Sequence, residues 1–130
     1  MTSLNNIDKT KAVLIVDDFS SMRRLYKVFL ERLGFTKIIE ASSGEEALTK
    51  LNEQTCSIII SDMYMPTLPG LELLKNIRSQ TRYKNVPFVL VSDGIGKEIL
   101  PKHLEDENTS FMVKPISVIA LKNKLEGICQ

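Results

Sequence analysis

Side chains that suit the binding of cations and phosphate follow four of the five short apolar segments of this 130-residue chain. They are Asp17 and Asp18 after the first segment, Asp62 after the third, Ser92 after the fourth and Lys114 after the fifth. Three carboxylates and one ammonium leave two negative charges uncompensated if they share one place. Close like charges cost free energy unless a cation neutralises them. Ligands that are all oxygen favour Mg²⁺ over Zn²⁺.

Asp62 is the central member of this set and is the best-placed nucleophile. Mg²⁺ keeps several waters and takes only one or two carboxylates, so a third carboxylate stays available for chemistry. A carboxylate that attacks a phosphoryl group needs the charge on the phosphoryl oxygens neutralised. Mg²⁺, the Lys114 ammonium and the Ser92 hydroxyl would supply that neutralisation. The pattern therefore indicates transfer of a phosphoryl group to Asp62.

Each of these residues also has an ordinary structural explanation when it is taken alone. Asp18 suits the cap of a helix, and Asp62 suits a turn ahead of Pro66. Ser92 is common in turns, and most lysines such as Lys114 are solvated surface charges. Their recurrence at the same end of separate apolar segments is what favours a shared site.

The apolar segments are short, rich in Val and Ile and bounded by turn residues, which is typical of strands buried on both faces. The expected strands cover residues 12–16, 38–39, 56–60, 88–91 and 111–113. Helical periodicity separates them, with Gly34 predicted to end the first helix and Ser43 with Glu46 predicted to form a capping box. Ser117 is predicted to cap the last helix. A weaker helix is expected between 95 and 106.

Strands that alternate with helices predict an α/β fold with a doubly wound parallel sheet of five strands and helices on both faces. Ligands of such sheets bind at the carboxyl ends of the strands. The chain is 43% hydrophobic and 25% charged, which suits one globular domain, and its net charge of +1 gives no reason to expect nucleic acid or an anionic membrane. Cys56 and Cys129 form no metal or redox motif, so we expect reduced thiols in a cytoplasmic protein without membrane insertion.

The polar motifs resemble those of a known family, the receiver domain of two-component response regulators in its single-domain, CheY-like form. They are Val16-Asp17-Asp18, Asp62 to Pro66 with Pro69-Gly70, Ser92, and Lys114-Pro115. The resemblance covers residues 11–128 and implies the flavodoxin-like strand order 2-1-3-4-5. We expect a polar leader at 1–10 and a receiver domain at 11–130.

The resemblance implies a magnesium site around the phosphoacceptor. Asp62 would accept a phosphoryl group from the phosphohistidine of a sensor histidine kinase, CheA-like or other. Asp18, Asp62 and the backbone carbonyl of Tyr64 would bind Mg²⁺ directly, and Asp17 would hold it through water. Lys114 would pair with Asp62 and then with the phosphoryl oxygens. The protein would catalyse only its own phosphorylation and dephosphorylation and would not be an enzyme otherwise.

The resemblance also implies a switch. Ser92 would move toward the phosphoryl group, and Phe111 would rotate into the space that it leaves. The face made by the helix between 95 and 106, the strand before Lys114 and the last helix would change and bind a downstream target. The peptide bond before Pro115 is expected to be cis. A static aromatic side chain in the core or on the surface is the alternative for Phe111.

Three departures from the family pattern lead to further expectations. Phe111 stands where CheY has Tyr and cannot donate a hydrogen bond, which weakens the inference that the target is a flagellar motor switch. Tyr64 and Gly94 stand where the family tunes hydrolysis. A bulky phenol and an absent side chain replace the amide and carboxylate with which CheY can orient water, so we expect slower hydrolysis than in chemotaxis regulators. Pro101 predicts a short, kinked or mobile helix between 95 and 106. The sole histidine, His103, is predicted to be a surface residue of that helix.

Other functions stay open to different degrees. A phosphorelay shuttle, which passes the phosphoryl group to a histidine phosphotransfer protein, is the main alternative to a chemotaxis-type signalling switch. A phosphatase with an aspartyl-phosphate intermediate does not fit Asp17 to Ser21, and a flavin binder would have its phosphate repelled by Asp17 and Asp18. We expect a monomer, with phosphorylation-dependent dimerisation as an open possibility.

Overall fold

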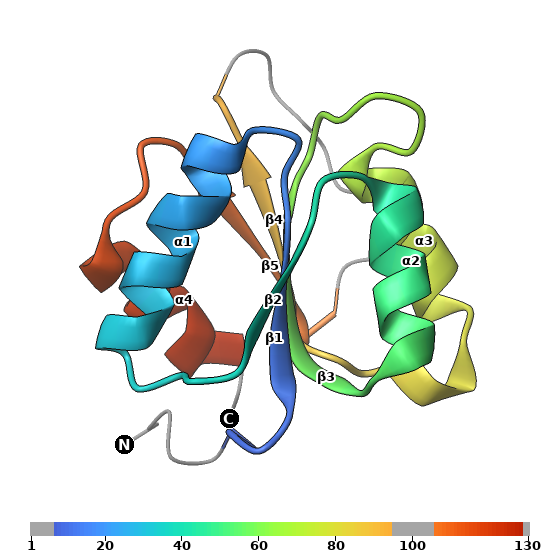
Figure 1. Cartoon of the computed structure of the whole chain (residues 1–130), viewed down its shortest axis with the longest axis horizontal. Coiled ribbons are helices and arrows are strands. Elements are labelled where there is room, and N and C mark those ends of the chain that lie inside the picture. Colours follow the sequence, from blue (N-terminus) through green and yellow to red (C-terminus); the bar gives the residue numbers. More distant parts are fainter. Residues whose placement is uncertain (1–6, 95–105, 129–130) are drawn as a thin grey trace.

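Five parallel strands form the centre of the structure, a computed structural model that describes residues 7–94 and 106–128. The strands are β1 (Ala12–Val16), β2 (Ile38–Ala41), β3 (Cys56–Asp62), β4 (Phe88–Ser92) and β5 (Thr109–Val113). Their order in the sheet is β2-β1-β3-β4-β5, which confirms the predicted topology (Figure 1). β2 and β5 lie at the edges, so the acidic ends of β1 and β3 lie side by side in the interior of the sheet.

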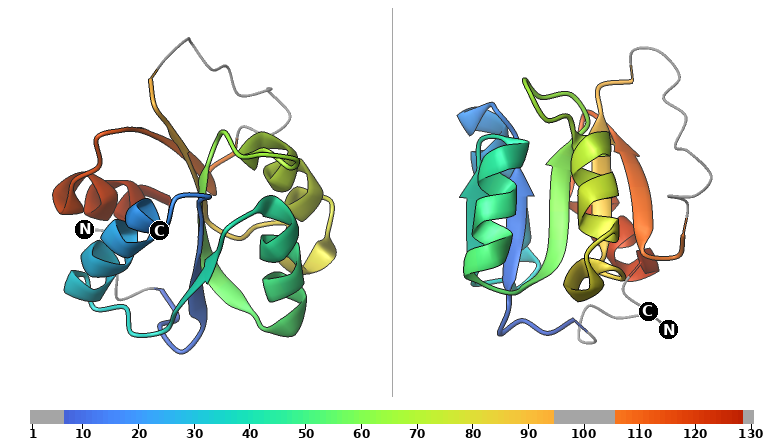
Figure 2. Two further views of the ribbon diagram at one scale, coloured as in Figure 1. Left: turned by 45° about the horizontal axis from the view of Figure 1, so that its top comes forward. Right: turned by 90° about the vertical axis from the view of Figure 1, so that its right-hand side faces the viewer.

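Helices cover both faces of this sheet, as predicted for a doubly wound fold. α1 (Ser20–Arg32) and α4 (Val118–Ile128) pack on one face, and α2 (Gly44–Glu53) and α3 (Gly70–Arg78) pack on the other (Figures 1 and 2). A 3-10 helix, Thr81–Tyr83, follows α3. The helix expected between 95 and 106, with Pro101 and His103, lies mostly outside the described residues. None of the described helices has the length and apolarity needed to cross a membrane.

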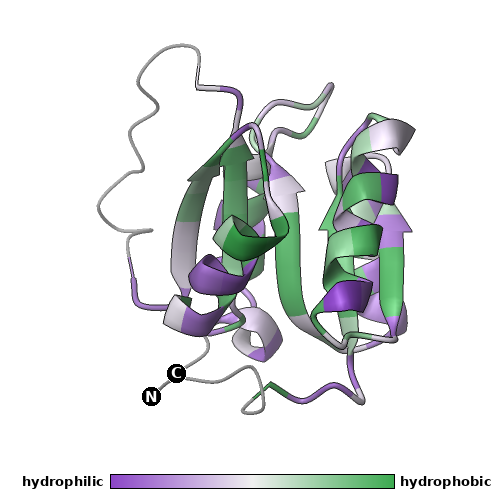
Figure 3. Ribbon diagram, turned by 90° about the vertical axis from the view of Figure 1, so that its left-hand side faces the viewer, coloured by the Kyte–Doolittle hydropathy of each residue, from purple (hydrophilic) through white to green (hydrophobic). Residues whose placement is uncertain are grey.

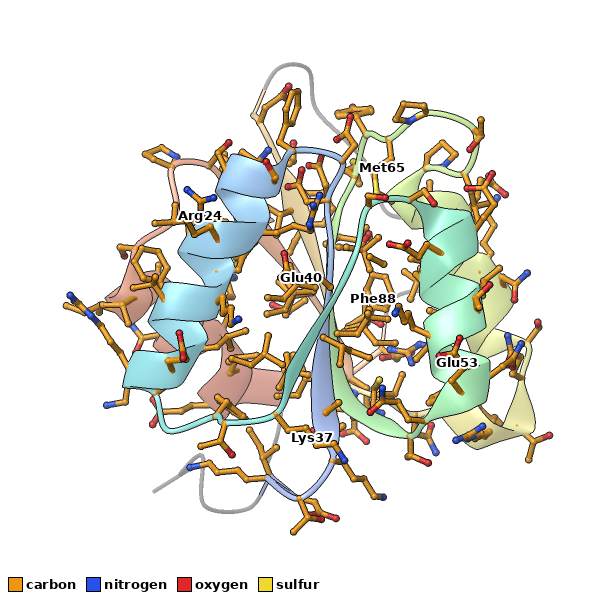
Figure 4. All side chains as sticks on the ribbon, in the orientation of Figure 1. Arg24, Lys37, Glu40, Glu53, Met65 and Phe88 are labelled. Carbon is orange, nitrogen blue, oxygen red and sulfur yellow. The ribbon has the colours of Figure 1, made fainter. Side chains whose placement is uncertain are left out.

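The two faces of the sheet build two separate cores because side chains alternate along each strand. Val13 and Ile15 of β1 belong to the core under α1 and α4, whereas Leu14 and Val16 belong to the core under α2 and α3. Figure 3 colours the central strands mostly hydrophobic, and every residue of β1 is buried. Phe88 lies on the α2 and α3 side (Figure 4). Ile7, within the predicted leader, is also buried in the α1 and α4 core.

The predicted helix ends are confirmed. Ser43 Oγ accepts a hydrogen bond from the Glu46 amide at 3.1 Å, and Ser117 Oγ accepts one from the Ala120 amide at 3.0 Å. Gly34 follows α1 with a φ of +96°, a conformation that favours glycine. The residue that precedes α1 is Phe19, and no side chain caps this helix. Asp18 is therefore not a helix cap, which removes its ordinary structural explanation.

Arg78, at the end of α3, connects this helix to the start of β5. Its guanidinium donates hydrogen bonds to the carbonyls of Tyr83 and Asn108, at 3.1 and 3.2 Å, and to Thr109 Oγ1 at 2.9 Å. Its Nε also lies 3.5 Å from Asp106 Oδ2. These contacts fix the turn at 106–108, so β5 and the lysine that follows it have a defined position.

Candidate functional site

The three aspartates come together at the carboxyl ends of β1 and β3. One carboxylate oxygen from each of Asp17, Asp18 and Asp62 lies within 4.8 Å of the others. The parallel register explains this, because Val16 pairs with Ser61 and an aspartate follows each of them in the chain. Asp17 and Asp62 are buried, whereas Asp18 is exposed. No other cluster of three potential metal ligands occurs in the described parts of the chain.

Lys114 reaches into this cluster from the end of β5. Its Nζ lies 3.5 Å from Asp62 Oδ1, and three quarters of its side chain is buried. The backbone amide of Lys114 donates a hydrogen bond to the Ser92 carbonyl at 2.8 Å, which ties the residue to the end of β4. The Lys114–Pro115 peptide bond is cis, as predicted. The lysine is therefore part of the site and not a solvated surface charge.

Ser92 is completely buried at the end of β4, next to the strand that carries Asp62. Its hydroxyl oxygen accepts a hydrogen bond from the Gly94 amide at 3.0 Å. Phe111 is half-buried and packs against the core under α2 and α3. Gly94 has a φ of +82°, and a Cβ there would lie 2.9 Å from Val113 Cγ1, so both its conformation and its surroundings favour glycine.

Asp17 accepts hydrogen bonds from its neighbours at one carboxylate oxygen and at its backbone carbonyl. Its Oδ1 accepts a hydrogen bond from the Phe19 amide at 2.9 Å, and its backbone carbonyl accepts one from Arg23 Nη1 at 2.7 Å. Arg23 Nε also pairs with Glu40 Oε1 of β2 at 3.0 Å (Figure 4 labels Glu40). Sequence reasoning missed Arg23 and Glu40, because nothing in their local pattern separates them from ordinary surface charges.

The electrostatics of the cluster favour uptake of a cation or a proton. Burial, and next the charge of Asp17, raise the pKa of Asp62 to about 6, although Lys114 opposes the shift. Burial also raises the pKa of Asp17 above its ordinary value, against the hydrogen bond from Phe19 and the charge of Lys114. Asp17 Oδ2 is buried and has no hydrogen-bond partner among the described residues. Hard oxygen donors with this excess of negative charge fit a divalent cation such as Mg²⁺.

The loop between β3 and α3 is folded tightly against Asp62. The Met63 amide donates to the Val91 carbonyl at 2.8 Å, and the Gly70 amide donates to the Met63 carbonyl at 2.9 Å. Tyr64 lies in this loop, directly after Met63, with its side chain half exposed. A Cβ on Gly70 would lie 2.2 Å from the Asp62 carbonyl oxygen. Only glycine lets α3 begin this close to the backbone of Asp62.

Replacement of Gly70 by alanine is therefore expected to displace Asp62 and to destabilise the protein by about 2 kcal/mol. The new methyl group would clash with a backbone carbonyl, which cannot move aside as the end of a flexible side chain can. Urea unfolding measures this change. Gly127→Ala is the matched control, since a Cβ at Gly127 meets nothing within 4 Å and the residue lies in α4. The control should stabilise the protein slightly, by up to about 1 kcal/mol. Equal effects of both substitutions would contradict this account of Gly70.

The chain is similar to known proteins over most of its length. Residues 13–126 match the family model described as the response regulator receiver domain. Over 117 residues the chain is 38% identical to the chemotaxis protein CheY1 of Helicobacter pylori, covering 89% of this chain and 94% of the relative. It is 35% identical over 122 residues to CheY-3 of Vibrio cholerae, with 94% of each chain covered. The solved structure of the chemotaxis response regulator CheY4 of Vibrio cholerae is 30% identical with a TM-score of 0.80, covering 91% of this chain and 98% of that one.

Proposed function

Because the chain belongs to the family of response regulator receiver domains, we propose that it is a signalling protein controlled by phosphorylation of Asp62. The observation that carries the proposal is the buried Asp62 carboxylate, which lies 3.5 Å from the Lys114 ammonium and beside Asp17 and Asp18. The phosphodonor would be the phosphohistidine of a sensor histidine kinase.

In the proposed reaction, a carboxylate oxygen of Asp62 attacks the phosphorus and the bond between phosphorus and the histidine nitrogen breaks. The leaving imidazole keeps the electron pair of that bond and takes up a proton. Lys114 Nζ exchanges its contact with Asp62 for contacts with the phosphoryl oxygens, where it neutralises charge. Beyond this reaction and the later hydrolysis, the protein has no proposed enzymatic activity.

The residues proposed to hold Mg²⁺ are Asp18 and Asp62 through their carboxylates, Tyr64 through its backbone carbonyl, and Asp17 through a water. Bound there, Mg²⁺ supplies positive charge to the phosphoryl oxygens. Asp17 suits an outer position because its Oδ1 is already bonded to the Phe19 amide. Asp18 suits a direct position because its side chain is exposed and Asp62 lies next to it.

The proposed output is a change of the surface around β5. A phosphoryl group on Asp62 offers new acceptors to the Ser92 hydroxyl, which at present accepts a hydrogen bond from Gly94. Movement of Ser92 would open space for Phe111, which already packs against the core at the edge of the sheet. The surface of β5 and α4 would then change shape for a target protein. The curated relatives named above are chemotaxis proteins, so we propose a chemotaxis pathway as the first one to examine.

The proposal is tested by incubating the protein with acetyl phosphate, with and without Mg²⁺, and by measuring incorporated phosphate. We expect incorporation only with Mg²⁺ and none in Asp62→Asn. Asp8→Asn is the matched control, because Asp8 is a carboxylate at the opposite end of the sheet, close to the start of β1. Incorporation by Asp62→Asn at the wild-type level would refute the proposed acceptor.

Tyr64 gives a prediction about the lifetime of the phosphoryl group. The proposed role of its bulky, half-exposed side chain is to cover the acceptor and keep attacking water away from it. Tyr64→Asn is expected to shorten the lifetime several-fold, since an amide can hold a water near the phosphorus. Decay of labelled protein after removal of the donor measures the lifetime. A wild-type lifetime equal to or shorter than that of Tyr64→Asn defeats the proposed role.

A further inference from the structure

Two buried polar atoms near the acidic cluster have no hydrogen-bond partner among the described residues, the hydroxyl of Tyr26 and Oδ2 of Asp17. Tyr26 is 1% exposed and Asp17 is completely buried. Buried polar groups are almost always hydrogen-bonded, and one left without a partner costs about 1–3 kcal/mol. Nothing in the packing of α1 requires a hydroxyl at this position, so the phenol needs another explanation.

Tyr26 lies in the core on the same face of the sheet as the side chains of Asp17 and Asp62. Tyr26 packs into the core under α1 and α4 with Ile15 of β1 and Ile60 of β3. Because side chains on one face recur every second residue, the next residues on that face are Asp17 and Asp62. The phenol and the two buried carboxylates therefore lie on the same face of the sheet.

The direction of α1 points the phenol toward those carboxylates. Helix side chains tilt toward the N-terminus of their helix, and α1 begins at Ser20, directly after the loop that follows β1 and carries Asp17 and Asp18 (Figure 1). Arg23, one helical turn before Tyr26, already reaches the Asp17 carbonyl at 2.7 Å. Burial raises the pKa of the Tyr26 phenol above its ordinary value, and the charges of Asp17 and then Asp62 raise it further, in agreement with their proximity. The phenol therefore stays protonated and is a hydrogen-bond donor.

We propose that Tyr26 is a positioning residue of the metal site and that its hydroxyl donates a hydrogen bond, through one bound water, to Asp17 Oδ2. This inference rests on the proposed function, since it concerns how the same site holds Mg²⁺. A neutral donor fixes the orientation of Asp17 and stabilises its charged form without cancelling the charge that attracts the cation. The shared water satisfies both unpartnered atoms, and Asp17 keeps its remaining acceptor capacity for the hydration water of the metal.

Tyr83 provides the matched comparison. It is another buried tyrosine, but its hydroxyl donates to the carbonyls of Leu51 and Gln54, at 2.7 and 3.1 Å. Those carbonyls lie at the end of α2 and just beyond it, away from the acidic cluster. Loss of the Tyr83 hydroxyl removes a satisfied hydrogen bond, whereas loss of the Tyr26 hydroxyl removes a donor to the metal site.

The experiment measures Mg²⁺ affinity by calorimetric titration of wild type, Tyr26→Phe and Tyr83→Phe. Tyr26→Phe is expected to bind Mg²⁺ about 10-fold more weakly, as replacement of a residue that supports a metal ligand does elsewhere. Tyr83→Phe should unfold at lower urea concentration with unchanged Mg²⁺ affinity. In phosphorylation by acetyl phosphate, Tyr26→Phe should need more Mg²⁺ for half-maximal rate and reach the wild-type rate at saturation.

A second readout uses the wild-type protein and does not depend on the folding of any variant. The chain has three tyrosines and no tryptophan, so tyrosine labelled with ¹³C at Cζ gives few resonances. Mg²⁺ should shift the Tyr26 resonance and leave the Tyr83 resonance unchanged. An unshifted Tyr26 resonance, or equal Mg²⁺ affinity in Tyr26→Phe and wild type, overturns the role of Tyr26 alone. Failure of wild type to bind Mg²⁺ overturns the proposed function with it.

Discussion

Asp62→Asn is expected to stabilise the metal-free protein at pH 7, raising the free energy of unfolding by about 2 kcal/mol. The carboxylate lies in a buried site beside Asp17, and these two causes raise its pKa to about 6. Asp62 is ionised at neutral pH, and its ionisation costs more free energy in the folded protein than in the unfolded chain. The charged carboxylate therefore lowers the free energy of unfolding. The neutral amide removes this penalty. For a domain of this size the melting temperature should rise by roughly 5–10 °C.

The pH dependence of this effect follows from the direction of the shift. The folded protein binds the Asp62 proton more tightly than the unfolded chain does, so ionisation lowers the stability as pH rises from about 4 toward 6. Above that window the full penalty is present, and below it wild type and Asp62→Asn should converge in stability. Thermal unfolding of both proteins without metal, at pH 4 and pH 7, measures the difference.

Magnesium and a second aspartate provide the controls for this prediction. Saturating Mg²⁺ should stabilise wild type and should stabilise Asp62→Asn much less, because binding to the folded state adds to stability. Asp8→Asn should give no gain, because hydrogen bonds from Thr10 hold the pKa of Asp8 below its ordinary value. A metal-free Asp62→Asn protein that is less stable than wild type at pH 7 would contradict the account.

Lys114→Met is expected to have opposite effects on the rate of phosphorylation and on the affinity for Mg²⁺. Phosphorylation by acetyl phosphate should slow by at least about 100-fold, because the variant lacks the cation that would neutralise the phosphoryl oxygens. Mg²⁺ should bind more tightly, because the variant lacks the ammonium that lies 3.5 Å from Asp62 Oδ1. That positive charge repels the cation. Initial rates of phosphate incorporation and a Mg²⁺ titration measure the two effects.

Lys122→Met is the matched control for the lysine, since Lys122 is exposed on α4 and belongs to no ion pair of the described residues. It should change neither the rate nor the affinity. If Lys114→Met slowed phosphorylation and also weakened Mg²⁺ binding, general disruption of the site would explain the loss better than the missing charge.

The site was predictable from sequence because it follows from the geometry of parallel sheets. Short apolar runs identified all five strands, and the carboxyl ends of neighbouring strands in such a sheet meet at one edge. Asp17 and Asp62 are adjacent because β1 pairs directly with β3. The position of Lys114 followed in the same way from the end of β5.

The contacts that complete the site were not predictable, because they join residues far apart whose local patterns are ordinary. The local sequence pattern predicts that Arg23 is an ordinary surface charge of α1. In the structure its side chain connects Asp17 to Glu40. The helical period of the first helix predicts that Tyr26 shares an apolar face with Leu30, but periodicity indicates burial and not the direction of a hydroxyl. The close approach of Gly70 to the Asp62 carbonyl likewise depends on the folded path of the intervening loop.

The central claim is that Asp62 carries the phosphoryl group and that its buried, metal-dependent site makes this possible. The most direct measurement is mass spectrometry that locates the phosphoryl group on peptides of wild-type protein treated with a phosphodonor, with and without Mg²⁺. The account predicts modification of Asp62 alone, and only when Mg²⁺ is present. Modification at another residue, or equal modification of Asp62 without the metal, would contradict it.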